Sequence, residues 1–262
     1  MTLLDRLERF YDAVPRERAR VEEFGGLTLF VRDGPGYPYY ARPRLGGPDP
    51  TPADVAAVRA RQRELGVPEA FEWVHDLTPD LLPIARAQGL DVLEAPLLVL
   101  GEGLGELRPT AKRARILDPA DPTYAGDLAV CRAISHLGFG APGTAVGKAG
   151  PEALVISPIP DEEVSRAIVT AIAESTVEGP LATGQYQRVG EVAEIVGVAT
   201  VPSARRKGLG AAVTATLAAH ALDHGVTVVF LSAGSDDVAR VYEGVGFKRV
   251  GTACIATGSA EV

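Results

Sequence analysis

Hydrophobic and polar residues along this chain follow two repeating patterns, one typical of helices and one typical of strands. Leu3, Leu7 and Phe10 recur at the spacing of one helix face and predict an opening helix. Thr51-Pro52 is a helix start signal and precedes a second helical pattern. The first hundred residues predict helices at 52–65 and 79–87 and strands at 27–31, 37–41, 71–74 and 92–100.

The remainder of the chain predicts a similar alternation of elements. A glycine-rich run, Gly101-Glu102-Gly103-Leu104-Gly105, indicates a linker. We therefore expect an amino-terminal domain at 1–107 and a carboxy-terminal domain at 108–262. In the latter, a loop rich in Gly and Pro covers 138–160 and a helical turn follows at 161–166. The patterns predict helices at 123–135, 208–224 and 236–245, and strands at 114–117, 168–173, 180–188, 193–201, 226–231 and 247–255.

The two halves share an order of elements that indicates an internal duplication. In the first half, a strand and a helix lie between Gly66 and Gly89, and another strand follows. In the second half, the same order occurs between Gly225 and Gly246. A glycine at a helix end followed by an apolar strand is common, so an ordinary connection that occurs twice is the alternative.

Composition and charge exclude several classes of protein. The chain has 262 residues, of which 46% are hydrophobic and 23% charged, as in globular proteins. Its net charge of −8 argues against nucleic acid as a partner. Two cysteines and four histidines, without metal-ligand spacing, predict neither a disulfide framework nor a metal centre. The start of the chain lacks a signal-peptide pattern and no run of about 18 apolar residues occurs, so we expect a cytoplasmic protein without membrane contact.

One segment carries a pattern that indicates anion binding. A strand over 193–201 ends at Pro202, and three basic residues and two glycines then lead into an alanine-rich helix. The first N–H groups of a helix have no intrahelical partner, and the helix dipole adds positive potential there. Gly208 and Gly210 let a diphosphate approach the backbone. A dinucleotide fold requires a third glycine where Val213 stands. The alternative is a surface turn with solvated arginines.

These residues resemble the GNAT N-acetyltransferase superfamily. Its Arg/Gln-x-x-Gly-x-Gly/Ala signature is matched by Arg205-Arg206-Lys207-Gly208-Leu209-Gly210. Its Asn-x-x-Ala-x-x-x-Tyr-x-x-x-Gly-Phe block is similar to residues 235–247, where Ser235 replaces Asn and Val238 replaces Ala. The resemblance covers roughly residues 112–258. It implies an α/β fold with a mixed, mostly antiparallel sheet flanked by helices, here in two GNAT-like lobes.

The resemblance further implies acetyl-CoA as the cosubstrate, without a metal. Backbone amides at the helix start hold the diphosphate, the preceding strand pairs with the pantetheine arm, and Val198 N–H donates to the thioester oxygen. Ser235 takes the position of an Asn that often touches the cofactor. The residues that the resemblance assigns to cofactor binding are Val198, Ala199, Thr200, Val201, Arg205, Arg206, Lys207, Gly208, Leu209, Gly210, Ala211 and Ser235.

Two residues are candidates for the catalysis of direct transfer to an amine. Tyr242 stands where the family commonly keeps a general acid for the departing sulfur; a core tyrosine is the alternative. Glu194 precedes Arg205 by the spacing that the superfamily's histone acetyltransferases give their catalytic glutamate; a solvent-facing Glu, with water as the base, is the alternative. Strand alternation predicts one face for Glu194, Val196 and Val198. His136 is more simply a surface residue.

The first half lacks the signature before its helix and resembles a degenerate lobe that has lost cofactor binding. For the acceptor we expect a small-molecule amine or a lysine or amino-terminal amine, and the acidic chain favours a cation. A homodimer is left open. Arginine outnumbers lysine, which is typical of a bacterial, GC-rich source. The rival interpretations are a non-catalytic acyl-CoA sensor, an interaction protein that binds another anion, and an enzyme for longer acyl groups.

Overall fold

The computed structural model describes residues 1–32, 34, 39–101, 103–160 and 167–258. The chain forms two compact units, one of Met1–Leu97 with Val250–Val262 and the other of Leu98–Arg249. Each unit is described by itself below. The predicted helical turn at 161–166 lies outside the described residues, as do residues 37–38 of a predicted strand.

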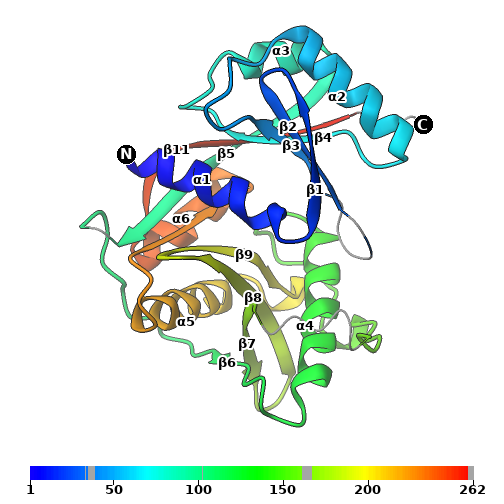
Figure 1. The fold of residues 1–262 in the computed structure, drawn as a ribbon. Coiled ribbons are helices and arrows are strands. Elements are labelled where there is room, and N and C mark those ends of the chain that lie inside the picture. Colours follow the sequence, from blue (N-terminus) through cyan, green and yellow to red (C-terminus); the bar gives the residue numbers. More distant parts are fainter. Residues whose placement is uncertain (33, 35–38, 102, 161–166, 259–262) are drawn as a thin grey trace. The chain divides into compact units, whose positions relative to one another are not determined.

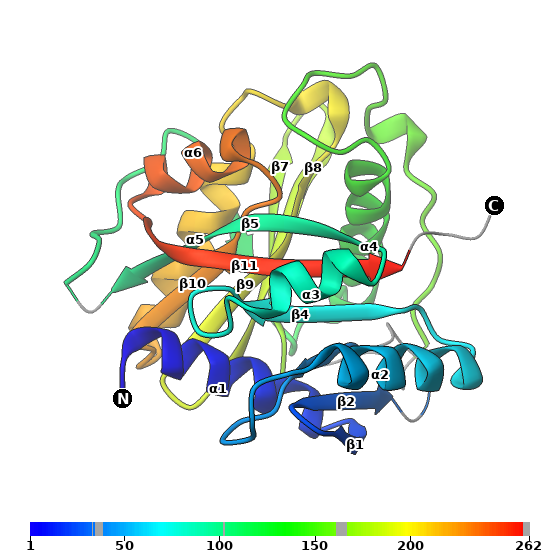
Figure 2. The ribbon, with the colours of Figure 1, turned by 90° about the horizontal axis from the view of Figure 1, so that it is seen from above.

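The first unit is a sheet with helices on both faces. The sheet has the order β1-β2-β3-β4-β11-β5 within this unit. Strand β3 is parallel to β4, whereas β1 with β2, β2 with β3 and β4 with β11 are antiparallel. Figure 1 shows α2 and α3 on one face and α1 on the other, and Figure 2 shows β4, β11 and β5 side by side. Its elements are α1 (Leu3–Arg16), β1 (Ala19–Phe24), β2 (Leu27–Arg32), β3 (Ala41–Pro43), α2 (Pro52–Leu65), β4 (Ala70–Val74), α3 (Leu81–Ala87), most of β5 (Leu90–Gly101) and most of β11 (Lys248–Gly258).

Local sequence explains where the helices of the first unit begin. Thr2 and Thr51 each accept a hydrogen bond from the backbone three residues later, and Asp5 and Asp54 bond back to the cap. Each pair is a capping box that satisfies helix N–H groups left without intrahelical partners. Apolar side chains of α2 and α3 then pack against Phe71 and the other core residues of the sheet.

The second unit has an antiparallel meander joined to one parallel strand. Its sheet order is β5-β10-β9-β8-β7-β6, where β9 and β10 are parallel and the strands from β6 to β9 are antiparallel. Figure 1 shows α4 and α5 on opposite sides of β8 and β9. Its elements are the end of β5, β6 (Arg115–Ile116), α4 (Tyr124–Phe139), a 3-10 turn at Pro151–Ala153, β7 (Val169–Ser175), β8 (Gly179–Val189), β9 (Val192–Thr200), a 3-10 turn at Pro202–Ala204, α5 (Leu209–Asp223), β10 (Val228–Ser232), α6 (Asp236–Val245) and the start of β11.

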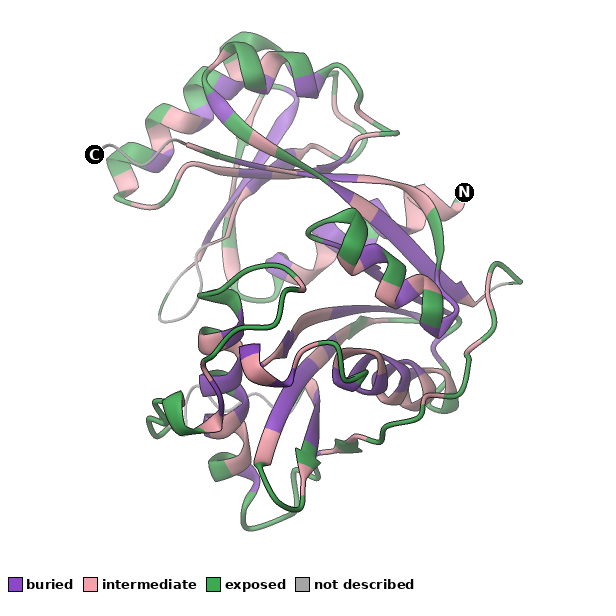
Figure 3. Cartoon of the chain, turned by 180° about the vertical axis from the view of Figure 1, so that it is seen from behind, coloured by how far each residue is buried: buried purple, intermediate pink, exposed green. Residues whose placement is uncertain are grey.

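The predicted fold class is confirmed, with differences at particular elements. Mixed, mostly antiparallel strands are flanked by helices, and buried residues lie along the strands and the inner sides of the helices (Figure 3). Strand β1 was not predicted, because its sequence is rich in charge and none of its residues is buried, as is common in edge strands. Helix α1 continues through Pro15 to Arg16, beyond the predicted apolar stripe.

The boundary between the units differs from the predicted division at residue 107. From Val250 onward, β11 belongs to the first unit. There it pairs with β4, with Cys254 opposite Trp73, and Cys254 and Ala256 join the core of that unit. A strand pairing between residues so far apart in sequence leaves no local signal. In the described part of the chain, no helix combines the length and apolarity needed to cross a membrane.

Candidate functional site

A cavity of about 780 Å³ lies in the second unit, where β9, the start of α5 and α6 meet. Its lining brings together both sequence motifs and part of the loop that follows α4. Most of the residues predicted to bind a cofactor are on its wall, together with Tyr242. The lining is drawn from residues 138–144, 195–200, 204–211 and 232–242.

A bulge reverses the alternation of side chains in the middle of β9. Gln185 of β8 pairs with Val196 and Thr183 pairs with Ala199, so β9 has one residue more than β8 in this interval. Gly197 has a φ of +65°, which a glycine adopts at little cost. Beyond the bulge, Val198 turns toward α5, and its Cγ1 lies 3.9 Å from the place where a Cβ of Gly210 would be.

The predicted shared face of Glu194, Val196 and Val198 is therefore wrong. Before the bulge, Ile195 pairs with Tyr186, whose hydroxyl lies 2.9 Å from His220 Nδ1 on α5. Ile195 thus faces α5 and Glu194 faces away from it. The extra residue at the bulge puts Val198 on the α5 face, opposite to Glu194.

Strands β9 and β10 separate beside the cavity. Their parallel register extends from Val192 to Glu194, opposite Val228 to Phe230. Strand β9 continues to Thr200, and residues 195–200 have no register partner on β10 among the described residues. The backbone of this stretch is therefore an edge that lines the cavity. Such an edge can form ladder hydrogen bonds with an extended ligand.

The start of α5 has the features of an anion site. Gly208 is the N-cap with a φ of +80°, and no side chain caps the helix. The first intrahelical bond runs from Ala212 N to Gly208 O, 3.1 Å long, so the amides of Leu209, Gly210 and Ala211 precede the ladder. Arg206, also in the left-handed region at φ +63°, is exposed beside them. Uncapped amides and a nearby cation favour a phosphate group.

Arg205 has a contact pattern that the sequence did not predict. Its guanidinium donates hydrogen bonds to the carbonyls of Gly138 at 2.8 Å, Ala141 at 2.5 Å, Ala145 at 3.2 Å and Thr200 at 3.4 Å. The side chain therefore joins the end of α4 and the loop after it to the end of β9. Arg205 lines the cavity, but its N–H groups already donate to carbonyls of the protein.

Three predicted residues lie outside the cavity lining. Val201 is fully buried and its N–H donates to Leu181 O at 2.9 Å, so this amide is not free for a ligand. Lys207 extends toward Glu178, with 3.6 Å between Nζ and Oε1. Glu194 is 7% exposed, and its Oε2 accepts a hydrogen bond of 3.1 Å from Gln187. His136 is exposed on α4 and does not line the cavity.

Tyr242 and Ser235 bring hydroxyl groups of α6 to the cavity. Tyr242 is 6% exposed, and its burial raises the pKa of the phenol to about 12. The phenol is therefore protonated at neutral pH, and it has no hydrogen-bond partner among the described residues. Ser235 is the N-cap of α6, and its Oγ accepts from Val238 N at 3.3 Å. The hydroxyl proton of Ser235 remains available for donation.

Comparison with known proteins shows to which family the segment with these features belongs. The model of the acetyltransferase (GNAT) family matches residues 153–247, which include β9, α5 and α6. This segment belongs to the GNAT family. No curated protein is similar enough to match the sequence.

Solved structures with the GNAT fold are similar over nearly the whole chain. A GCN5-related N-acetyltransferase from Kribbella flavida has a TM-score of 0.73 and 21% identity, over 99% of this chain and 97% of that one. A GCN5-related N-acetyltransferase-like protein from Streptococcus suis has a TM-score of 0.57 and 12% identity, over 97% and 98%. A tandem GNAT protein from the clavulanic acid biosynthesis pathway has a TM-score of 0.52 and 14% identity, over 88% and 78%. These likenesses establish the fold.

Proposed function

We propose that the second unit is an N-acetyltransferase that transfers the acetyl group of acetyl-CoA directly to a primary amine. The observation that carries the proposal is that a separated β9 edge and an uncapped helix start lie in one cavity. An extended arm that ends in a diphosphate matches both features. The GNAT family match over this segment supports acyl-CoA as the donor.

The residues fit acetyl-CoA in a particular arrangement. The diphosphate is held by backbone amides from Arg206 to Ala211, where Gly210 leaves room for close approach. The pantetheine arm pairs with β9 from Val198 to Thr200, because the next amide, that of Val201, is already bonded to Leu181. The thioester oxygen accepts a hydrogen bond from Val198 N–H beside the bulge, which stabilises the negative charge that develops there. Ser235 donates to the cofactor from α6.

The transfer needs two proton movements besides the bond changes. The amine nitrogen forms a bond to the thioester carbon, and the C–S bond then breaks in the tetrahedral intermediate. Tyr242 gives its proton to the departing sulfur, and the proton lost by the amine passes to a water or, through a water, to Glu194, which lies outside the cavity lining. Amines of the lysine type are about one part in 10³ neutral at neutral pH, so a proton acceptor is needed.

Thermal unfolding with and without acetyl-CoA tests the cofactor site first. At a ligand concentration of about 100 times Kd, binding stabilises the folded state by about 2.7 kcal/mol. We expect a clear rise in Tm for the wild type and none for the double variant Gly208→Glu with Gly210→Glu. Thiol release with a panel of small amines, lysine peptides and amino-terminal peptides then identifies the acceptor class. A folded wild type without a Tm shift would contradict the proposal.

A non-catalytic acyl-CoA sensor is the second candidate function. It is favoured by the position of Glu194, whose carboxylate is bonded to Gln187 and outside the cavity lining. A sensor predicts the Tm shift without thiol release for any amine in the panel. An enzyme for longer acyl groups predicts thiol release that increases with acyl-chain length.

In this proposal, the first unit is a second, degenerate GNAT-like lobe that does not bind the cofactor. Its helix α2 begins with a side-chain cap from Thr51, where α5 has an uncapped glycine. A capped helix start is not open to a diphosphate. The similarity of 88% of this chain to a tandem GNAT protein supports this interpretation.

A further inference from the structure

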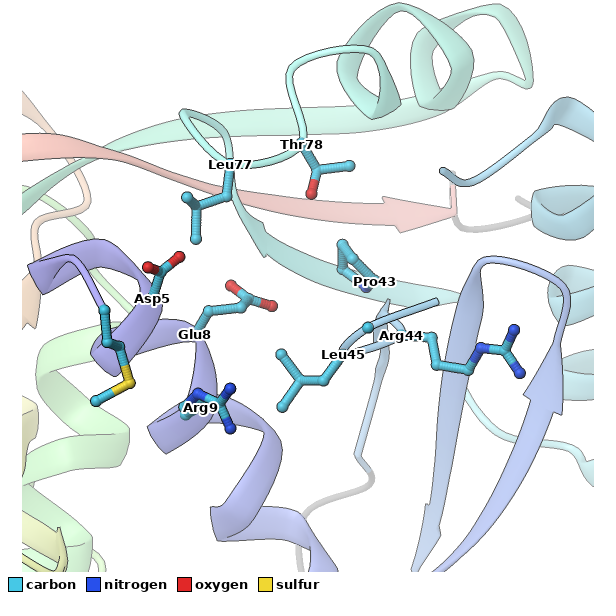
Figure 4. A pocket seen from close by; sticks show the side chains of 10 residues that line it. Asp5, Glu8, Arg9, Pro43, Arg44, Leu45, Leu77 and Thr78 are labelled. Carbon is cyan, nitrogen blue, oxygen red and sulfur yellow. The ribbon is translucent and has the colours of Figure 1, made fainter. Parts of the chain in front are cut away.

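A separate cavity of about 530 Å³ lies entirely within the first unit. Figure 4 shows its wall, which comes from α1, from the residues that follow β3 and from the turn after β4. Leu45 and Leu77 on this wall are 39% and 38% exposed, so the cavity has an apolar and accessible rim. A space of this size is sufficient for a small organic ligand.

Glu8 is the buried polar residue of this wall. The residue is 6% exposed, and its Oε2 accepts a hydrogen bond of 2.9 Å from Nη2 of the fully buried Arg42. Its other oxygen, Oε1, is buried without a hydrogen-bond partner. In Figure 4 the carboxylate of Glu8 points inward, between Leu77 and Pro43. A carboxylate oxygen only accepts hydrogen bonds, so the missing partner is a donor.

Asp5 and Arg44 at this cavity have partners of their own, and the amino terminus of the chain also acts on Asp5. Asp5, one turn earlier on α1, accepts a hydrogen bond of 2.8 Å from Thr2 N, and this bond lowers the pKa of its carboxyl. Arg44 is paired with Glu23 at 2.7 Å. Arg9 is exposed on the wall. The two carboxylates on this stretch of α1 therefore favour a cationic donor on this side, and the exposed Arg9 favours an anionic substituent farther out.

We propose that this cavity binds a primary ammonium group carried on an apolar body. The ammonium donates a hydrogen bond to Oε1 of Glu8 and is attracted by Asp5, while the apolar body packs against Leu45 and Leu77. A charge-assisted hydrogen bond of this kind is stronger than a neutral one. The inference does not rest on the function proposed for the second unit, since every lining residue belongs to the first.

Binding of a matched pair of probes to the full chain tests the inference. We choose phenethylammonium and the uncharged 2-phenylethanol, measured by calorimetry and by amide NMR shifts at pH 8, where the ammonium remains charged. The expected result is saturable binding of the ammonium, with shifts at Glu8, Leu45 and Thr78, and affinity for the alcohol at least tenfold weaker. Equal affinity for the two probes, or no saturable shift at these amides, would overturn the inference.

Variants of the wall separate the role of Glu8 from a general effect of charge. Glu8→Gln keeps the shape and should weaken ammonium binding at least tenfold. Glu72→Gln is the matched control, because Glu72 also lies near Arg42, at 3.9 Å, but does not line the cavity. It should change the affinity by less than threefold. If Glu8→Gln does not fold, Leu45→Lys adds a cation at the exposed rim and should cause the same loss; unchanged binding in the folded variant would refute the assignment.

Discussion

The guanidinium of Arg205 donates a 2.8 Å hydrogen bond to the carbonyl of Gly138, across 67 positions of the sequence. Gly138 packs closely on β9 as well, since a Cβ there would lie 3.0 Å from the Cβ of Ala199. The first residue of the basic run therefore fixes the loop that forms one wall of the cavity beside β9. Its charge stabilises carbonyls at the end of α4, where the helix dipole favours a cation.

Replacement of Arg205 by Lys should loosen this wall. A lysine ammonium cannot reproduce the planar set of donors, so we expect a loss of about 1–2 kcal/mol in the free energy of unfolding. KM for acetyl-CoA should rise more than kcat falls, because the wall rather than the reacting atoms is disturbed. Arg206→Lys at the exposed neighbouring position is the control and should leave stability unchanged. Equal effects of the two variants in urea unfolding would contradict this role of Arg205.

Two glycines at the start of α5 should respond differently to the same substitution. Gly208→Ala puts a side chain at φ +80° and should destabilise the fold by about 1–2 kcal/mol. Gly210→Ala places a Cβ at an ordinary 3.7 Å from Thr200 Oγ1 and should leave Tm nearly unchanged. Gly210→Ala should nevertheless weaken acetyl-CoA binding, because the methyl group lies at the proposed diphosphate site. Titration calorimetry and thermal unfolding measure the two effects; unaltered affinity in Gly210→Ala would argue against a diphosphate at this helix start.

Tyr242→Phe tests the proposed general acid. Loss of the hydroxyl should lower kcat about 10²-fold and leave KM for acetyl-CoA within a small factor. Because the pKa of Tyr242 is raised to about 12, the wild type should show no loss of kcat from its ionisation below about pH 10. Steady-state thiol release from pH 7 to pH 10 checks both points. A core role alone would leave kcat of the folded variant intact, because phenylalanine keeps the packed ring.

Glu194→Gln distinguishes the two candidate bases. If Glu194 accepts the proton, the variant should lose most of its kcat at neutral pH and regain part of it as the pH rises and more of the amine is neutral. Glu178→Gln, at an exposed partner of Lys207, serves as the control. A pH–rate profile identical to that of the wild type would assign the step to a water.

Alkaline conditions should destabilise the fold in two stages. Burial raises the pKa of the Cys131 and Cys254 thiols to about 11, and that of Tyr242 to about 12. Each group is neutral in the folded state. Its contribution to the free energy of unfolding is therefore complete at a pH below its pKa in the unfolded chain, and is lost as the pH rises through its pKa in the folded protein. The stabilising contribution of the thiols is therefore lost mainly between about pH 9 and 11, and that of the phenol between about pH 10 and 12. Urea unfolding from pH 8 to pH 11 should show a shallower decline in a Cys131→Ala with Cys254→Ala variant than in the wild type; parallel curves would contradict the prediction.

Local patterns predicted most of the secondary structure and most of the residues that line the cavity in the second unit. The helix start at Gly208 and the apolar strand before it are set by adjacent residues, and so are the capping boxes of α1 and α2. The edge strand β1 escaped prediction because solvent exposure permits charges that weaken the apolar pattern. The boundary between the units was not predicted from local patterns, because β11 pairs with β4, which lies far away in the sequence.

The sequence by itself determined which residues form the uncapped start of α5, since a glycine-bordered helix start depends on neighbours along the chain. Only the tertiary structure decided which way they face. The one-residue bulge in β9 arises from pairing with β8, and it turns Val198 away from the side of Glu194. Tertiary contacts likewise bring four carbonyls within hydrogen-bond distance of the Arg205 guanidinium, and they leave Oε1 of Glu8 without a partner. Such contacts depend on segments brought together by folding, and so periodicity along the chain does not encode them.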